Sequence, residues 1–557
     1  MSGEPIQCHG SDGCDTISSA CTPIIVIPGV MGSRLHFGAS RTWDPDSNLS
    51  MLRWVPGSQS GVQTNRAALT VATASSFVTE LDSGAKSDIA WNSGVYKSAQ
   101  RELKQTYPPS LDQIQSYFGV KRNWASVAWG FYGPVLMRLE AEFNATRTEC
   151  PVYAFGYDWR KSNADSGAKF KQFLLDTLKA NPTAKQCIVV THSMGGFVVR
   201  SALAGDGGDL AAKIRGVIHT VHPSNGAVAC YTRFFSGVSS PVENIGSFDV
   251  ASNVLATILG GTDAEYAYNM SGLPGPLQLL PNHLYQQSMS SGKWLDGLDD
   301  GADLGQVYAI YKGGGRGGLS PAVSWAQTKC GTQGEQRSLT VQENFSRHIA
   351  TAQSFHESLA GAANQGYHAN TVVMYSTGLD TMYAVRMNTD SDPIRPSDHF
   401  QTKNPPGAVV VTDKWKKIAY TRRPRGDGTV PDVSAACPGA QGATVEVAAS
   451  ALEHSKVFAS AAFNNRLVFF LKKQRQPLAM LDGTDADGAA DTGRLASDDA
   501  APDGDTSVAD AADGSDGADG AGDDADQSGA LVAEGDGGTG DAGADRTGDT
   551  GDDGAIA

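Results

Sequence analysis

The stretch CIVVTHSMGGFVVRSAL, residues 187–203, decides the fold. Its first half is a short β-branched run, which predicts a strand buried on both faces of a parallel sheet. Its second half repeats apolar side chains at helical spacing, which predicts a helix. Between the two halves lie His192, Ser193, Met194 and two glycines. The sequence therefore predicts a strand that turns sharply into a helix, with a serine at the turn.

Apolar runs of the same kind occur before and after this stretch. They cover residues 23–29, 152–155, 216–221, 307–311 and 371–375, and an alternating run covers 444–447. Apolar side chains at helical spacing predict helices over 135–143 and 170–178, and a last helix over 455–473. Alternating strands and helices predict an α/β fold, with a mostly parallel central sheet and helices on both of its faces.

The remaining segments divide the chain into three parts. Residues 36–120 and 223–300 are long interruptions rich in small polar residues, and we interpret them as lid or cap insertions. They belong to a folded domain predicted over residues 21–474. A leader over residues 1–20 precedes this domain, and a tail over 475–557 follows it.

The charge of the chain is concentrated in the tail. The net charge is −16, but residues 481–557 hold 22 of the 60 acidic side chains and only two of the 44 basic ones. This Asp-, Gly- and Ala-rich composition predicts disorder. A calcium-binding nonapeptide repeat would need regular large apolar residues, which the tail lacks. The body is close to neutral and has no basic stripe, so no nucleic-acid partner is expected.

The N-terminus has neither a basic nor an apolar segment, so no signal peptide is expected. No apolar run is long enough to predict a membrane span. A cytosolic location, or export without a cleaved signal, agrees with both observations. The eight cysteines include no CxxC pair of a zinc or redox site. Cys187 is expected as a buried thiol, whereas Cys8, Cys14 and Cys21 could form bridges in an oxidising compartment.

The turn at Ser193 has the sequence context of a nucleophile elbow, the tight strand-to-helix turn of the α/β-hydrolase fold. Small residues must follow the serine, and Gly195 and Gly196 meet that need. Thr191 occupies the place of the first glycine of the strict motif. The alternative interpretation is that Ser193 only caps a helix. We favour the nucleophile because partner residues occur further along the chain.

A nucleophilic serine needs a base that is oriented by an acid, and this fold orders them as Ser, acid and His. His454 is the last of eleven histidines and lies between a predicted strand and the final helix, where the base belongs. His192 adjoins the serine but lies on the wrong side of the turn. His219 and His222 lie at a strand end and are candidates to line the pocket. The other histidines are expected on the surface or in loops: His9, His36, His283, His348, His356, His368 and His399.

The best candidate for the acid is Asp427, which lies between two glycines 27 residues before His454. Amides of such a tight turn can keep a carboxylate ionised. Asp380, which follows the predicted strand at 371–375, is the rival. For the oxyanion hole, the helix start offers the Met194 N–H, and the loop after the first strand offers the Met31 N–H.

Together these stretches resemble the lecithin:cholesterol acyltransferase family of lipases and acyltransferases, and bacterial members in particular. They follow the order of that family over about residues 21–470. The matching stretches are 25–35, 157–160, the elbow at 193, 276–281, 375–379, 426–431 and 453–454.

The resemblance implies Ser193, Asp427 and His454 as a catalytic triad and the Met31 and Met194 amides as the oxyanion hole. It implies an α/β-hydrolase fold with lid insertions and a lipid or other acyl-ester substrate at a membrane surface. No cofactor or metal ion is expected.

The resemblance also assigns three residues outside the triad. Trp43 is expected in a lid near the substrate. Asp158 and Arg160 are expected to form a structural ion pair near the edge of the sheet. Similar bacterial lipases without a signal peptide act as effectors of contact-dependent secretion systems, so a secretion-system partner is a further expectation.

Three functions therefore stay open at this point. The first is a serine esterase or lipase, phospholipase A-like, that works through an acyl-enzyme. The second is an O-acyltransferase that passes the acyl group to an alcohol. The third is a non-catalytic lipid-binding protein that keeps the fold. In addition, the acidic tail could itself be an interaction segment.

Overall fold

The computed structural model describes the chain from residue 21 to residue 475, with gaps. The described residues are 21–37, 41–46, 51, 53–55, 58–70, 121–144, 150–206, 208–238, 258–290, 292–332, 340–387, 408–412, 417–423 and 425–475. The predicted leader at 1–20 and nearly all of the predicted tail lie outside this set, as do Cys8 and Cys14.

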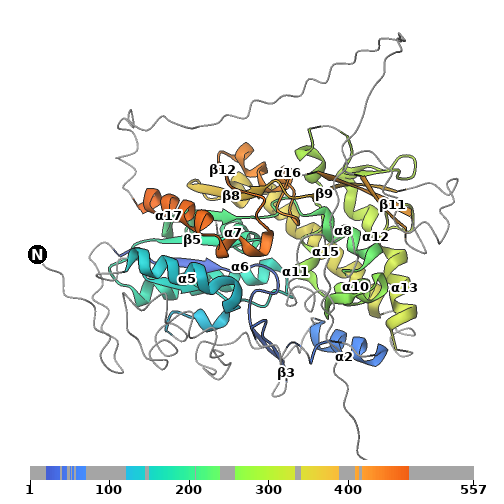
Figure 1. Cartoon of the computed structure of the whole chain (residues 1–557), viewed down its shortest axis with the longest axis horizontal. Helices are drawn as coiled ribbons and strands as arrows, with labels where there is room; N and C mark the ends of the chain where they lie inside the picture. Colours follow the sequence, from blue (N-terminus) through green and yellow to red (C-terminus); the bar gives the residue numbers. More distant parts are fainter. Residues whose placement is uncertain are drawn as a thin grey trace, which may run out of the picture. The chain divides into compact units, whose positions relative to one another are not determined.

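A six-stranded parallel sheet forms the centre of the fold, as the sequence predicts (Figure 1). Its strand order is β12-β8-β6-β5-β1-β4, and every neighbouring pair is parallel. The strands are β1 (Ile24–Ile27), β4 (Val152–Ala154), β5 (Cys187–His192), β6 (Ile214–Thr220), β8 (Thr371–Thr377) and β12 (Thr444–Ser450).

Helices cover both faces of this sheet. Side chains alternate along β1, so that Ile24 and Val26 pack with one face and Ile25 and Ile27 with the other. The helices α5 and α17 pack on the first face, and α6 and α7 pack on the second. Their bounds are α5 (Trp129–Phe143), α6 (Asn163–Ala180), α7 (Gly195–Ala204) and α17 (Ala461–Arg475). The predicted α/β arrangement is therefore confirmed.

A second group of elements follows α7 in the sequence and lies to the right of the central sheet in Figure 1. It contains a four-stranded sheet of order β10-β11-β9-β7. The strands are β7 (Leu295–Asp296), β9 (Thr381–Met387), β10 (Ala408–Thr412) and β11 (Lys417–Arg423). The helices are α8 (Val228–Ser236), α10 (Asp263–Met270), α11 (Pro274–Leu277), α12 (Val307–Lys312), α13 (Ser320–Cys330), α15 (Thr340–Gly361) and α16 (Asp432–Ala435).

The earlier insertion contributes a hairpin and a helix. The hairpin pairs β2 (Leu35–Phe37) with β3 (Arg41–Trp43), and the helix is α2 (Gln59–Leu69). Short 3-10 helices complete the described elements: η2 (Trp124–Ser126), η3 (Ala211–Lys213), η4 (Tyr285–Ser288), η5 (Leu304–Gln306), η6 (Ala363–Gly366), η7 (Cys437–Gln441) and η8 (His454–Ala459).

Two predicted elements are wrong in detail. The run at 307–311 is the helix α12, not a strand, and it buries Val307, Tyr308 and Tyr311 on one side. The predicted last helix is interrupted at Ser460, which has extended backbone angles between η8 and α17. The Ser460 hydroxyl accepts the Phe463 N–H (3.3 Å), so this serine caps the start of α17.

Buried arginines tie α2 to the rest of the fold. Arg160, just after the edge strand β4, forms two hydrogen bonds of 2.8 Å with the carboxylate of Asp158, as expected for a structural pair. Its guanidinium also donates to the carbonyls of Ala68 (3.1 Å) and Leu69 (3.0 Å) at the end of α2. From α2 itself, Arg66 donates to the Tyr268 carbonyl and to the Ser271 hydroxyl.

Candidate active site

Ser193 lies at the strand-to-helix turn between β5 and α7. Its φ of 51° is in the left-handed region, which a residue other than glycine rarely adopts. Its N–H donates to the Thr220 carbonyl of the neighbouring strand (3.0 Å). The glycines that follow allow this close packing. A Cβ on Gly195 would lie 2.6 Å from the Pro28 carbonyl oxygen, and one on Gly196 would lie 2.4 Å from the His222 ring. The turn therefore has the geometry of a nucleophile elbow.

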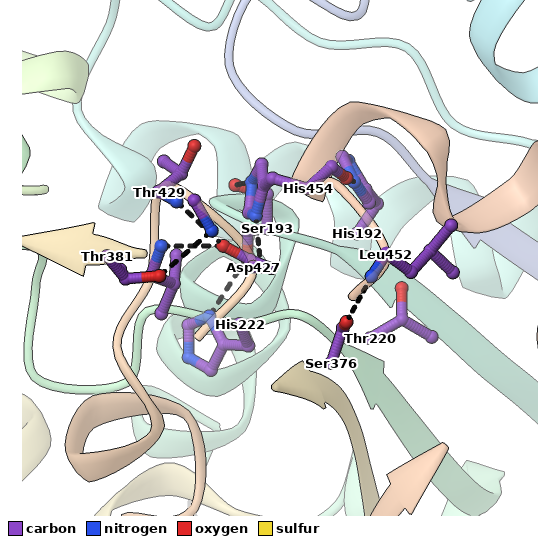
Figure 2. Close-up of polar contacts among 12 residues, drawn as sticks. His192, Ser193, Thr220, His222, Ser376, Thr381, Asp427, Thr429, Leu452 and His454 are labelled. Atoms are coloured by element: carbon purple, nitrogen blue, oxygen red, sulfur yellow. Dashed lines mark hydrogen bonds and ion pairs between the residues drawn. The ribbon is translucent and has the colours of Figure 1, made fainter. Parts of the chain in front are cut away.

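Three side chains from distant parts of the sequence form a continuous chain of hydrogen bonds (Figure 2). His454 Nε2 is 2.8 Å from Ser193 Oγ, and His454 Nδ1 is 2.7 Å from Asp427 Oδ2. Ser193 is 5% exposed and Asp427 is 2% exposed. The structure thus brings together the three residues that the sequence predicts as nucleophile, base and acid.

The Asp427 carboxylate is held from both sides. Its Oδ1 accepts the N–H groups of Thr429 (3.0 Å) and Val430 (2.7 Å), which leaves Oδ2 for His454. Thr381 fixes the turn that carries Asp427, because its hydroxyl accepts the Gly428 N–H (2.9 Å) (Figure 2). These contacts fix the orientation of the carboxylate toward His454.

The rival acid, Asp380, is exposed to solvent. It has no hydrogen bond to His454 within the part of the chain that the structure describes. The contact geometry therefore favours Asp427.

The loop that carries His454 is fixed through its backbone. The His454 N–H donates to the Asp427 carbonyl (3.0 Å), so acid and base are joined by main chain as well as by side chain. Two residues earlier, the Leu452 N–H donates to the Ser376 hydroxyl (3.1 Å) (Figure 2).

The loop after β1 lies directly against the elbow. A Cβ on Gly29 would be 2.9 Å from Ser193 Cβ. Residues 29–32 form a turn closed by the Gly32 N–H and the Gly29 carbonyl (3.2 Å), in which Met31 has a φ of 62°. Neither the Met31 nor the Met194 N–H has a hydrogen-bond acceptor among the described residues. These two amides can therefore receive an oxyanion.

Trp43 is fully buried, so in this structure it has no exposed lid surface. Its ring packs against Trp54 and Trp159, with centroid distances of 5.6 Å and 5.1 Å. Its indole N–H donates to the Met31 carbonyl (3.2 Å). The residue assigned to a lid thus supports the turn that carries a candidate oxyanion donor.

Five histidines, which we call the buried histidines, lie inside the fold: His192, His219, His222, His348 and His356. Burial lowers the pKa of all five, to about 3 for His192, His219 and His356 and to about 4 for His348. His348 and His356, on α15, are therefore not surface histidines as predicted. His222 Nδ1 donates to the Ser193 carbonyl (2.9 Å), so it supports the elbow from behind (Figure 2).

Several residues that support the site are not predicted from the sequence. Thr381 and Ser376 hold the acid and base loops, and Tyr132 contacts the turn after β1. They come from β8, β9 and α5, and no local motif marks them. Cys187 is a buried thiol, as predicted.

No group of three or more metal-ligating side chains occurs among the residues that the structure describes. Of the described helices, none combines the length and apolar character needed to cross a bilayer.

The six-stranded parallel sheet and the serine at positive φ on a strand-to-helix turn define the α/β-hydrolase fold. Residues 142–293 match the model of the lecithin:cholesterol acyltransferase family. The resemblance inferred from the sequence is confirmed over these residues. The match includes Ser193, whereas Asp427 and His454 lie beyond it.

The fold is also similar to a chain in the crystal structure of the Tle4–Tli4 complex. The TM-score is 0.53 at 19% sequence identity, and the match covers 82% of this chain and 99% of the other. At this identity the similarity supports the fold alone. A search of the curated proteins finds no match.

Proposed function

We propose that the protein is a serine esterase that cleaves a lipid acyl ester, with Ser193 as nucleophile, His454 as base and Asp427 as acid. The observation that carries this proposal is the hydrogen-bond chain from Ser193 Oγ through His454 to Asp427, with links of 2.8 and 2.7 Å. Both distances lie within the range in which a proton can be transferred.

The reaction begins when Ser193 Oγ attacks the ester carbonyl and its proton passes to His454 Nε2. Asp427 keeps the other ring nitrogen protonated and stabilises the imidazolium. The amides of Met31 and Met194 bind the oxyanion, a contribution of about 3 kcal/mol per donor. The tetrahedral intermediate collapses to an acyl-enzyme as His454 returns the proton to the leaving alcohol. No cofactor takes part in these steps.

The second step decides between two activities. Water that attacks the acyl-enzyme gives a phospholipase A-like hydrolase, and an alcohol gives an O-acyltransferase. The family model that matches residues 142–293 is named for acyl transfer from a lecithin, which favours a lipid donor and keeps the transferase as second candidate. An assay with an added alcohol acceptor separates the two activities.

The nucleophile is tested with a fluorophosphonate probe and with phosphatidylcholine vesicles. We expect labelling and release of fatty acid by the wild type, and loss of both in Ser193→Ala. Ser201→Ala, on the same helix, is the matched control and should keep both. If the wild type is not labelled and releases nothing, the protein is a non-catalytic lipid-binding protein instead. Adding a sterol or lysolipid acceptor, with product analysis by mass spectrometry, distinguishes transfer from hydrolysis.

The partner and the location are further parts of the proposal. We infer action at a membrane surface, with a secretion-system partner. The chain of similar fold was itself crystallised in a two-protein complex, Tle4–Tli4. Truncation at Pro477 tests the tail: esterase activity should persist, whereas export or partner binding should be lost.

A further inference from the structure

A second chain of hydrogen bonds runs behind the triad and does not include the nucleophile. The Gly29 N–H donates to Tyr132 Oη (2.8 Å), and Tyr132 Oη lies 3.0 Å from His192 Nδ1. His192 Nε2 lies 3.1 Å from the carbonyl oxygen of His454. This relay, Gly29–Tyr132–His192–His454, joins the turn after β1, the helix α5, the elbow and the base loop.

Each hydrogen bond in this relay has only one possible direction. The Gly29 N–H can only donate, so the tyrosine oxygen accepts it and directs its own proton to His192 Nδ1. The His454 carbonyl can only accept, so His192 carries its proton on Nε2. This requires a neutral imidazole. Burial, followed by the nearby His454, lowers the pKa of His192 to about 3, which keeps the ring neutral at pH 7.

The relay also contacts both ends of the turn from Gly29 to Gly32, which we call the oxyanion turn. Tyr132 donates no proton to Gly32, but its ring packs so closely there that a Cβ on Gly32 would lie 2.6 Å from the hydroxyl. The turn between Gly29 and Gly32 contains Met31, one of the two candidate oxyanion donors. Tyr132 is 3% exposed and His192 is 8% exposed, so water does not readily replace these hydrogen bonds.

We propose that Tyr132 and His192 are positioning residues that fix the oxyanion turn relative to the base loop. This inference rests on the proposed function, because it assigns these residues to the alignment of Met31 and His454. The relay would stabilise the transition state by keeping the Met31 amide and His454 at a constant separation. During the reaction, negative charge develops on the oxyanion beside Met31 and positive charge develops on His454. Small errors in such positions cost large factors in rate.

Three substitutions separate the two ends of the relay. Tyr132→Phe removes the acceptor for Gly29 and the donor to His192. His192→Gln can keep the donor to His454 but loses the acceptor for Tyr132, whereas His192→Asn does the reverse. We expect each to lower kcat about tenfold with KM within twofold, because the loss falls on transition-state alignment. Tyr132→Phe and His192→Gln break the same link, so their effects should not add, whereas Tyr132→Phe and His192→Asn should add.

A matched control exists elsewhere in the molecule. Tyr308 Oη lies 2.5 Å from His356 Nδ1, and His356 Nε2 lies 3.0 Å from the Gln278 carbonyl oxygen. This tyrosine–histidine–carbonyl chain repeats the arrangement of Tyr132, His192 and the His454 carbonyl, but it has no hydrogen bond to the triad among the described residues. Tyr308→Phe and His356→Gln should therefore lower the thermal midpoint in a similar way but leave kcat within twofold.

The outcomes distinguish this inference from the function on which it rests. The inference is wrong if the wild type shows Ser193-dependent ester cleavage and Tyr132→Phe keeps kcat within twofold. It is also wrong if kcat falls equally in Tyr308→Phe, since the effect would then follow stability alone. A wild type without Ser193-dependent activity overturns the proposed function itself. If Tyr132→Phe does not fold, His192→Gln breaks the same hydrogen bond and gives the same comparison.

Discussion

Replacing Asp427 with asparagine changes one atom of the triad and reverses the polarity of a single hydrogen bond. In the wild type, Oδ1 accepts two backbone N–H groups, from Thr429 and Val430, and Oδ2 faces His454 Nδ1. An asparagine keeps its oxygen against the two donors, because the opposite orientation would place N–H against N–H. Its NH₂ group therefore faces His454.

This orientation forces the wrong tautomer on the base. A donor 2.7 Å from Nδ1 requires a lone pair there, which moves the ring proton to Nε2, 2.8 Å from Ser193 Oγ. His454 can then no longer accept the serine proton. The same change in a Ser-His-Asp protease lowers kcat by about 10⁴. Each factor of ten is about 1.4 kcal/mol, so we expect a loss of about 5 kcal/mol in transition-state stabilisation.

The assay is hydrolysis of a short p-nitrophenyl ester, with the rate of fluorophosphonate labelling as a second measure. Asp427→Asn should remain folded, because both backbone hydrogen bonds to Oδ1 persist, and its thermal midpoint confirms this. Asp380→Asn is the control, and because Asp380 is exposed it should keep kcat/KM within twofold. A folded Asp427→Asn protein that retains more than a tenth of wild-type kcat/KM would refute the assignment of the acid.

Three further predictions concern the scaffold. Burial lowers the pKa of the buried histidines below 6.5, so between pH 6.5 and about 3 the unfolded chain binds more protons than the folded chain. The contribution of these neutral histidines to the free energy of unfolding is thus fully present above pH 6.5. It falls on acidification by up to about 1.4 kcal/mol per pH unit for each histidine. Equal urea midpoints at pH 7 and pH 5 would contradict this prediction. Arg160→Met removes the buried guanidinium that pairs with Asp158 and should cost about 3–5 kcal/mol by denaturant titration, whereas Lys161→Met, 3.8 Å from the same carboxylate, should cost little. Gly196→Ala places a Cβ 2.4 Å from the ring of His222 and should lower both kcat and the thermal midpoint, although alanine alone would favour the helix.

The sequence predicts those features that local pattern controls. The elbow at Ser193 was readable because a buried strand, a serine, two glycines and an apolar helix follow one another within seventeen residues. Asp427 and His454 could be found because the fold orders the triad along the chain. The sequence of α12 predicts a strand where the structure has a helix, because a run of five aromatic and aliphatic residues fits the period of either element.

Features that depend on tertiary contact were not readable. Tyr132 lies 60 residues before His192, and nothing near either residue indicates that they meet. The break at Ser460 interrupts a continuous helical pattern, because the serine hydroxyl caps α17 there. His356 looks like an exposed histidine from its neighbours, but it is buried by Phe197 and Tyr308 from other elements.

The attachment of α2 has a consequence for anyone who wishes to shorten this protein to a minimal hydrolase. The insertion at 36–120 looks dispensable, yet deleting α2 would remove two carbonyl acceptors from the buried guanidinium of Arg160. It would also take Arg66 away from the carbonyl of Tyr268 and so expose α10. A shortened protein would therefore need new hydrogen-bond acceptors for Arg160 and a new donor for the carbonyl of Tyr268. The helix α2 is therefore needed for the stability of the fold, and deletions should be made in other segments first.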